Sequence, residues 1–566
     1  MADLLQKANK KILLGNEAIV RGALEAGVGF ISTYPGTPAS EIGLIFFEMA
    51  QQKLKEKKKP SFYFEFSTNE KTAMEAAVGA SFCGLKTLVA MKNFGLNVAS
   101  DALMPFLYTG TNKGACVLVV ADDPSCHSSA QSEQNSRPFS YMAHIPTLEP
   151  GDPQQCLDFI KEAFKISSKM SLPVMVRTTT RVAHQKMPVS IAKSIKQKAN
   201  SKAQIKFIAN KHQYVTMPPR VLEMKEELLT KIEKIKDLAE KSPLNKVEFA
   251  NSKKTTGIIA SGVGYLYVKE ALKELNIELP LMQLGFFYPL PEKKIKSFLK
   301  KLTQVIIVEE LEGFIEKEIE AIAKTANPKI KIFGKNVLPQ TGELRPEQVI
   351  LAISKVIKKR LKPFEQINFR PVKHLPRFCT GWPTCPYWKL FAAVKQAAPK
   401  QTIFGGDIGC YMIAALPPHN LYDYLSCMGS SVGIAHGIKK ATQNKQKVIA
   451  FIGDGTFLHS GIEALLNAVY NQSNLLLIVL DNSITAMTGH QPNPSTAKTG
   501  MGLMSHPVKI EEVVKALGVQ NIKVLDQEEE YEQLVKTIKD FSNKKDVSVI
   551  IARRICGLLA KRNLKK

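Results

Sequence analysis

Short apolar runs alternate with amphipathic stretches along the first third of the chain. The runs are rich in β-branched residues and have the length of buried strands, whereas the stretches between them have helical spacing. This alternation is typical of a parallel sheet with helices on both faces. We expect strands at 29–33, 62–66, 87–91, 116–121 and 173–177, and helices at 18–26 and 70–83.

The same pattern returns twice further along the chain. A second unit has expected strands at 257–261, 281–284 and 304–308, and a third has strands at 448–452 and 475–480 around a helix at 460–471. We therefore predict an α/β fold with three doubly wound, mostly parallel-sheet domains at 1–185, 253–357 and 377–556. The predicted connections are a lysine-rich helical connector at 186–252, a linker at 358–376 and a frayed basic tail at 557–566.

The sequence after the strand at 448–452 has the features of a site for magnesium and a diphosphate. Gly453-Asp454-Gly455 follows this strand, and Asn482 follows the next strand after one intervening helix. Such a crossover returns the chain to the same edge of the sheet, so Asp454 and Asn482 can share one ion. Mg²⁺ prefers hard oxygen ligands, and the carbonyl of Ile484 is a third candidate. Gly-Asp-Gly alone would indicate only a tight turn, but the flanking strands favour a cofactor site.

Glu70 is a candidate acid at the start of a helix of small residues. A carboxyl group in a dry pocket has a raised pKa and can share a proton with a bound ring. The alternative is that Glu70 only complements the helix dipole. Glu75 is a rival in the middle of the same helix, where solvent or a lysine would pair with it. The residues alone do not choose between these roles.

Composition and charge change this interpretation little. The net charge of +26 would suit a nucleic-acid partner, but the lysines are scattered without aromatic interleaving, which favours a solvated surface. No apolar run approaches the ~20 residues of a membrane span, and the start lacks the apolar core of a signal peptide. We therefore expect a cytoplasmic protein that binds neither nucleic acid nor membrane. The nine cysteines indicate reduced thiols or metal ligands rather than disulfides.

Several motifs resemble those of thiamine-diphosphate enzymes, and among these the 2-oxoacid:ferredoxin oxidoreductases. The stretch from Glu70 to Gly79 resembles the helix of their pyrimidine-binding domain. The chain is most similar to the large (alpha) subunits of indolepyruvate ferredoxin oxidoreductases, and its middle unit resembles a transketolase C-terminal-like domain. The carrying motifs are GNEAIVRGALEAG at 15–27, YPGTPASE at 34–41, KNFGLNVASD at 92–101, ADDPSCHSS at 121–129, EQNSR at 133–137, GFFYPLP at 285–291, VEELE at 308–312, GDIGC at 406–410, CMGSS at 427–431 and TAMTGHQ at 485–491.

The resemblance implies thiamine diphosphate and Mg²⁺ as cofactors and coenzyme A as a co-substrate. It implies that Glu70 is the acid that activates the pyrimidine ring, and that magnesium is held by Asp454, Asn482 and Ile484. It also places Thr37, His127 and His490 near the substrate. Further cofactor contacts are expected from Gly409, Cys427, Met428, Gly429, Gly453, Gly455 and Thr485.

The sequence departs from the family pattern in two places that concern electron transfer. The family has a C-terminal ferredoxin-like segment that does not occur in this sequence up to Lys566, and Trp382 replaces the second cysteine of a Cys-x-Gly-Cys motif. We expect one [4Fe–4S] cluster, which needs four thiolates. The alternative is that the cysteines are small buried residues left from a lost cluster. The expected ligands are Cys379, Cys410 and Cys556, with Cys385 as the substitute.

The resemblance implies a catalytic subunit for oxidative decarboxylation of an aryl 2-oxoacid to its acyl-CoA, with electrons passed to ferredoxin. It also implies an oligomer with a small gamma/beta-type subunit, and a ferredoxin or a separate ferredoxin-type subunit. A cluster-free thiamine-dependent decarboxylase or carboligase is one alternative. A non-catalytic scaffold is another, although the joint presence of Glu70, Asp454 and Asn482 argues against it.

Overall fold

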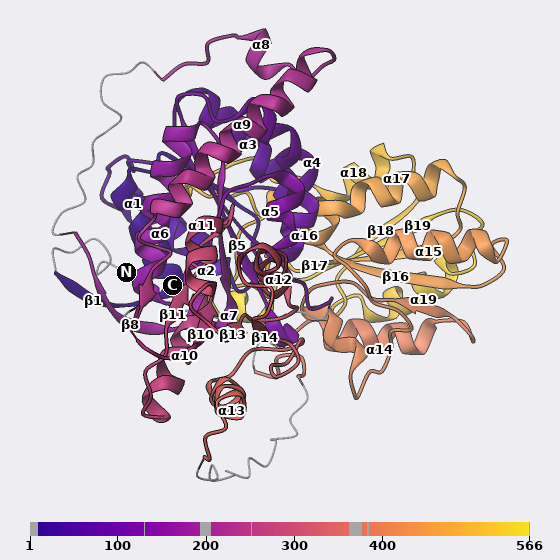
Figure 1. The fold of residues 1–566 in the computed structure, drawn as a ribbon. Helices are drawn as coiled ribbons and strands as arrows, with labels where there is room; N and C mark the ends of the chain where they lie inside the picture. The colour runs from indigo at the N-terminus through magenta and orange to yellow at the C-terminus, as the bar shows by residue number, and fades with distance from the viewer. Residues whose placement is uncertain are drawn as a thin grey trace. The chain divides into compact units, whose positions relative to one another are not determined.

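The chain divides into two compact units, a first unit of residues 1–366 and a second unit of residues 367–566 (Figure 1). The computed structural model describes residues 9–128, 131–192, 205–250, 252–361, 376–381 and 384–564. Three mostly parallel α/β sheets confirm the predicted fold class, two in the first unit and one in the second.

The first sheet has seven strands in the order β12-β6-β7-β5-β4-β2-β3, and all neighbours except β12 and β6 are parallel. Helix α1 packs against α6, and α3 packs against α4. The strands are β2 (Phe30–Thr33), β3 (Tyr63–Phe66), β4 (Lys86–Lys92), β5 (Ala115–Asp122), β6 (Thr147–Leu148), β7 (Val174–Thr179) and β12 (Phe286–Tyr288). The main helices are α1 (Gly15–Ala26), α2 (Ser40–Lys55), α3 (Glu70–Phe82), α4 (Asn93–Thr109) and α6 (Pro153–Met170).

The second sheet also belongs to the first unit and has the order β14-β13-β10-β11-β9, with only β9 antiparallel to its neighbour. Its strands are β9 (Val247–Glu248), β10 (Thr256–Ala260), β11 (Leu281–Gln283), β13 (Gln304–Val308) and β14 (Lys331–Phe333). The helices are α10 (Val263–Glu274), α11 (Glu292–Leu299), α12 (Phe314–Ala326) and α13 (Pro346–Val356). The predicted connector contains α8 (Lys211–Tyr214) and α9 (Arg220–Lys241).

The sheet of the second unit is wholly parallel, in the order β15-β16-β17-β19-β18. Its strands are β15 (Ile403–Gly405), β16 (Val448–Gly453), β17 (Leu476–Asp481), β18 (Asn521–Leu525) and β19 (Ser548–Arg553). The helices are α14 (Tyr387–Ala397), α15 (Ser430–Ala441), α16 (Asp454–Thr456), α17 (Ile462–Tyr470), α18 (Ile510–Ala516), α19 (Tyr531–Phe541) and α20 (Gly557–Leu564).

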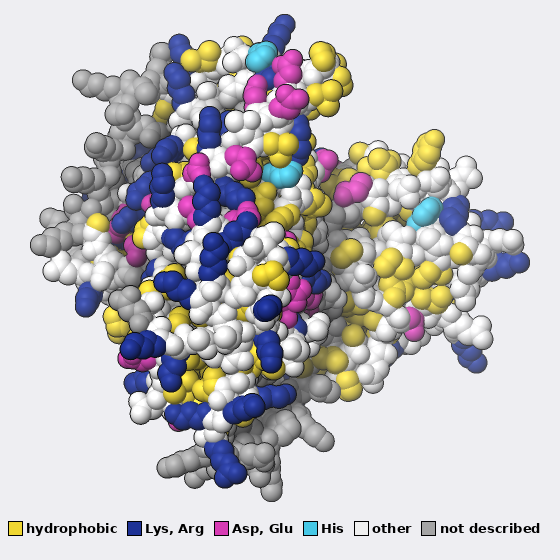
Figure 2. Space-filling model, viewed as in Figure 1, with side chains coloured by type: hydrophobic (Ala, Val, Ile, Leu, Met, Phe, Trp, Pro, Cys, Tyr) yellow, Lys and Arg dark blue, Asp and Glu magenta, His cyan; other side chains and the backbone are white. Residues whose placement is uncertain are grey.

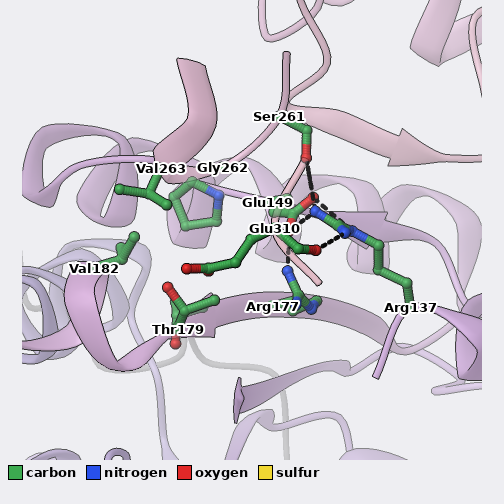
Figure 3. A pocket seen from close by; sticks show the side chains of 11 residues that line it. Arg137, Glu149, Arg177, Thr179, Val182, Ser261, Gly262, Val263 and Glu310 are labelled. Carbon is green, nitrogen blue, oxygen red and sulfur yellow. Dashed lines mark hydrogen bonds and ion pairs between the residues drawn. The ribbon is translucent and has the colours of Figure 1, made fainter. Parts of the chain in front are cut away.

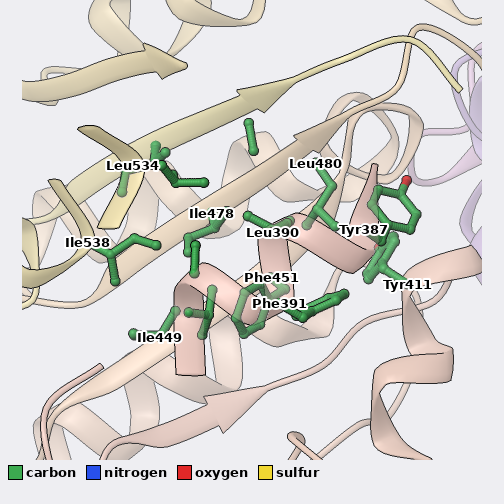
Figure 4. Packing of buried hydrophobic residues seen from close by; sticks show 14 of the residues in the cluster. Tyr387, Leu390, Phe391, Tyr411, Ile449, Phe451, Ile478, Leu480, Leu534 and Ile538 are labelled. Atoms are coloured by element: carbon green, nitrogen blue, oxygen red, sulfur yellow. The ribbon is translucent and has the colours of Figure 1, made fainter. Parts of the chain in front are cut away.

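Both faces of this third sheet are buried, which explains why its central strands are apolar throughout. Ile449 and Phe451 of β16 point into one core, where helix α14 packs (Figure 4). Val448, Ala450 and Ile452 alternate with them and belong to a separate core on the other side. Because successive side chains of a strand face opposite ways, every position must be apolar when both faces are covered.

Three sequence predictions need correction. The connector does not start at 186, because β8 (Lys186–Ser190) pairs antiparallel with β1 (Lys10–Leu14). The middle domain is not confined to its own sheet, because β12 pairs with β6 in the first sheet. The expected frayed tail is instead helix α20, which agrees with its high content of the helix formers Leu, Ala, Lys and Arg. Most of the predicted linker, residues 362–375, lies outside the described residues, as does Trp382.

A buried ionic network joins the two sheets of the first unit (Figure 3). The Glu149 carboxylate accepts hydrogen bonds from Arg137 Nη2 at 2.8 Å, from Arg177 Nη1 and from the Ser261 hydroxyl. Arg137 Nη1 also lies 3.2 Å from Glu309 Oε2, after β13 of the second sheet. Because Glu149 follows β6 and Ser261 follows β10, this single carboxylate fixes the ends of strands from both sheets.

The surface fits the interpretation of the charge as solvated lysines. Figure 2 shows Lys and Arg side chains scattered over the visible face among acidic and neutral ones, rather than gathered in one groove. Among the described residues, no helix is both long and apolar enough to cross a bilayer.

We predict that Glu149→Gln destabilises the first unit by about 3–5 kcal/mol, because it leaves two buried arginines without their shared counter-charge. Chemical unfolding followed by circular dichroism measures this loss. Glu292→Gln is the matched control, since Glu292 is one-third exposed and pairs with Lys236 and Lys296, and such pairs contribute under about 1 kcal/mol. Equal losses in the two variants would contradict the prediction.

Candidate active site

Asp454 is a buried carboxylate at the carboxyl end of β16, in the second unit. Its hydrogen-bond donors are neutral: the N–H of Gly455 at 2.7 Å, the N–H of Ile484, and Asn493 Nδ2 at 3.3 Å. Burial raises the pKa of the Asp454 carboxyl to about 7, and the neighbouring Asp481 carboxylate adds to the rise. A buried carboxylate without a cationic partner is costly when ionised, and a divalent cation would remove that cost.

Asn482 lies beside Asp454, because Gly453 and Leu480 are partners in the parallel pairing of β16 with β17. The hydrogen bonds define how its amide points. The Ile484 N–H can only donate, so the atom 3.1 Å from it is Asn482 Oδ1. The Asn482 Nδ2 then donates to the Tyr387 hydroxyl at 2.8 Å. The carbonyl-type oxygen Oδ1 has a second lone pair, so the residues present fit a magnesium ion. The role of the Ile484 carbonyl as a third magnesium ligand stays a prediction.

Asp407 organises the loop that contains the predicted contacts Met428 and Gly429. Its carboxylate accepts hydrogen bonds from the N–H of Gly429 at 2.8 Å, Ser431 at 2.9 Å and Ile408 at 2.7 Å. Burial raises the pKa of Asp407 to about 6. This role was not predicted from the sequence, although an Asp two residues after the end of the short strand β15 was the available signal.

Two glycines of this site permit close contacts that a side chain would prevent. Gly429 has φ of 83° and a Cβ there would meet the Ser460 hydroxyl, which lies in the π-helical turn Phe457–Gly461. A Cβ on Gly455 would lie 2.9 Å from Thr485 Oγ1. π-Helical turns such as Phe457–Gly461 are frequent at functional sites. The other predicted contacts, Gly409, Cys427 and Gly453, lie in the segments after β15, before α15 and at the end of β16.

In the first unit, the carboxyl ends of four neighbouring strands carry the other predicted site residues. Thr37 follows β2, Glu70 follows β3 and His127 follows β5, whereas Gly95, which was not predicted, follows β4; these strands are adjacent in the order β5-β4-β2-β3. Ligands bind at this edge in doubly wound sheets.

The structure distinguishes Glu70 from its rival. Glu70 is only 7% exposed, and Gly95 at the start of α4 lies against its carboxylate, where a Cβ would come within 2.7 Å of Oε1. The Glu75 side chain is 53% exposed and lies 4.0 Å from Lys71. Burial therefore supports Glu70, rather than Glu75, as the candidate acid.

A hydrogen-bond network connects the segments of Thr37 and His127. The Ser128 Oγ lies 2.9 Å from the Thr37 carbonyl and 2.7 Å from Asp123 Oδ2, and its single proton can be donated to either acceptor. Lys92 Nζ donates to the same Asp123 oxygen at 2.9 Å, and burial lowers the pKa of Lys92. The network holds the loops after β2 and β5 together.

The two predicted substrate histidines are found in different units. The His127 side chain is half exposed, with Nε2 at 3.4 Å from Glu343 Oε2. His490 lies in the second unit, with Nε2 at 3.7 Å from the Cys556 thiol. His490 therefore borders the cysteines, and its predicted place near the substrate stays a prediction.

The four cysteines proposed for a cluster are neighbours in the second unit. Burial raises the pKa of Cys385 to about 12, and the charges of Cys379, Cys410 and Cys556 add to the rise. Burial raises the pKa of Cys410 to about 11 in the same way. Within the described residues, no three His, Cys, Asp or Glu side chains are placed to hold one metal ion. A [4Fe–4S] cluster at these cysteines stays a prediction.

Comparison with known proteins identifies the class. The chain matches the family model of the C-terminal thiamine pyrophosphate-binding domain over residues 407–552. It matches the thiamine diphosphate-binding model of pyruvate flavodoxin/ferredoxin oxidoreductases over 21–241, and the indolepyruvate oxidoreductase domain over 246–370. Together with the fold and both sites, these matches define a thiamine diphosphate-dependent oxidoreductase.

Curated relatives give the particular family. The chain is 39% identical to indolepyruvate oxidoreductase subunit IorA of Methanothermobacter marburgensis, over 98% of this chain and 88% of that protein. It is 39% identical to the subunit of the same name from Pyrococcus horikoshii, over 97% of this chain and 86% of that protein. The chain belongs to the family of these indolepyruvate oxidoreductase subunits. A distant likeness to the solved 2-oxoglutarate:ferredoxin oxidoreductase of Magnetococcus marinus (18% identity, TM-score 0.49, 62% of this chain and 65% of that one) adds nothing to the assignment.

We predict that Gly95→Ala destabilises the protein by about 1–3 kcal/mol, because the new methyl group overlaps the buried Glu70 carboxylate. Gly79→Ala in α3 is the control, since a Cβ there meets nothing within 4 Å and Ala is favoured over Gly in a helix by about 0.8–1.0 kcal/mol. Chemical unfolding should move in opposite directions for the two variants. A shift of the same sign would show that Gly95 does not position Glu70.

Proposed function

We propose that this chain is the catalytic subunit for oxidative decarboxylation of an aryl 2-oxoacid, such as indolepyruvate, to its acyl-CoA. The reaction would use thiamine diphosphate and Mg²⁺, with coenzyme A as co-substrate and ferredoxin as electron acceptor. The observation that carries the proposal is the buried Asp454 carboxylate, which has no cationic partner among the described residues, beside Asn482, which directly follows the next strand. The substrate class follows from the names of the curated relatives.

Each side chain has a defined task under this proposal. Asp454 and Asn482 would hold magnesium through side-chain oxygens, and the loop held by Asp407 would lie against the diphosphate. Thiamine diphosphate supplies an electron sink for decarboxylation when it is bound. Glu70, buried and backed by Gly95, would keep a proton on its carboxyl oxygen for the pyrimidine nitrogen.

Electron transfer would use the cysteines of the second unit. We propose that Cys379, Cys385, Cys410 and Cys556 hold one [4Fe–4S] cluster, and their mutual proximity supports this assignment. We further propose a small gamma/beta-type partner subunit and a ferredoxin-type protein, because the curated relatives are named as subunits.

We predict that Glu70→Gln lowers decarboxylation by about 10²-fold or more, since it removes an acid–base group, while cofactor binding persists. Binding is measured independently as stabilisation by Mg²⁺ and thiamine diphosphate, about 2.7 kcal/mol at a hundredfold excess over the dissociation constant. Glu75→Gln, in the same helix, should retain both binding and activity. Asp454→Ala should lose both. Full activity in Glu70→Gln would refute the assigned role.

We predict that the chain purified anaerobically with its partner subunits is brown and has about four iron and four sulfide ions at the cysteines of the second unit. Cys385→Ser should lower this content, whereas Cys83→Ser, in the first unit, should not. Iron and sulfide analysis together with the visible spectrum provides the measurement. Colourless, iron-free protein that still releases carbon dioxide would instead indicate a non-oxidative decarboxylase.

A further inference from the structure

Asn482 is contacted from two of the three chain segments that carry candidate cluster thiols. Its side-chain Nδ2 donates to the hydroxyl of Tyr387, two residues after Cys385. Its backbone carbonyl accepts a hydrogen bond from the N–H of Cys556 at 3.0 Å. Both contacts lie within the second unit. The residue proposed to bind magnesium is therefore held by two of the segments that carry the thiols.

Tyr387 is itself fixed in place. It is the first residue of α14, it is buried, and its N–H donates to the Cys385 thiol. Its ring packs edge-on against Phe378 at 5.6 Å and Tyr411 at 6.2 Å, at one end of the core in Figure 4. A ring confined on these sides cannot change rotamer without opening the core. Burial raises the pKa of Tyr387 well above its ordinary value, so the hydroxyl stays neutral.

The hydroxyl of Tyr387 determines which atom of the Asn482 amide is available to a cation. An asparagine amide can rotate by half a turn and exchange its oxygen and nitrogen, which only its hydrogen-bond partners prevent. Here Tyr387 accepts from Nδ2 and the Ile484 N–H donates to Oδ1. Without Tyr387, Nδ2 would be buried with no acceptor, which favours rearrangement of the amide.

We propose that Tyr387 is a positioning residue for magnesium, whose hydroxyl orients the Asn482 amide so that Oδ1 is presented to the ion. The inference rests on the proposed function, because it concerns the same magnesium site. Groups that orient a metal ligand from behind commonly change metal affinity by 10–100-fold when they are removed.

The test compares Tyr387→Phe with Tyr422→Phe in the full-length chain. Tyr422 is a matched control, because its ring packs against the same core and its hydroxyl donates to the Tyr411 carbonyl at 3.0 Å, not to a candidate metal ligand. The dissociation constant for Mg²⁺ is measured by calorimetric titration in excess thiamine diphosphate. Melting without the cofactor reports the structural loss in each variant.

We expect Tyr387→Phe to weaken Mg²⁺ binding at least tenfold and Tyr422→Phe to change it less than twofold, with similar decreases in melting temperature. Unchanged affinity in Tyr387→Phe, or equal weakening in both variants, would overturn the role of Tyr387 and leave the proposed function standing. Absence of magnesium-dependent cofactor binding by the unaltered chain would overturn both.

Discussion

The burial of the Asp454 carboxylate is the constraint on which the candidate active site depends. The apolar strand β16 passes between two cores and ends at Asp454, so the carboxylate is buried wherever the sheet forms. In the first unit, by contrast, the charge of the buried Glu149 carboxylate is compensated by Arg137 and Arg177. In the second unit, Arg553 is paired with Asp481 and not with Asp454. A buried charge with internal partners holds sheets together, and one with only neutral donors is suited to a cation.

The sequence was most informative where local pattern and packing agree. The two central strands of the third sheet, β16 and β17, were found because both of their faces are covered, which makes almost every position apolar. The placement of Asp454 and Asn482 at one edge followed from strand order alone. Contacts between distant segments could not be found in this way. The pairing of β12 with β6, and of Arg137 with Glu309, joins residues far apart in the sequence, and no local pattern specifies them.

Burial of the side chain distinguishes the candidate acid from its rival, which the spacing of polar residues could not do. The sequence placed Glu70 at the start and Glu75 in the middle of the same small-residue helix, but it did not decide whether Glu70 activates a cofactor or only complements the helix dipole. The close approach of Gly95 buries the first, and solvent surrounds the second. Asp407 was missed for a related reason. Its three hydrogen bonds run to its neighbour Ile408 and to N–H groups of a loop more than twenty residues away, and such contacts become visible only when β15 and α15 are in place.

The topology of the third sheet explains why the candidate magnesium site and the candidate cluster thiols are held by common chain segments. Strand β17 ends at Asp481, directly before Asn482, and its parallel neighbour β19 ends at Arg553, three residues before Cys556, so the pairing of these strands brings Asn482 and Cys556 into contact. Tyr387 adds a second connection from α14, which packs on the same face of the sheet as the side chains of Ile478 and Leu480. Since packed interiors transmit small displacements, a displacement of the thiol-bearing segments would also move the Asn482 amide. The arrangement therefore links the geometry of the proposed magnesium site to that of the proposed cluster thiols.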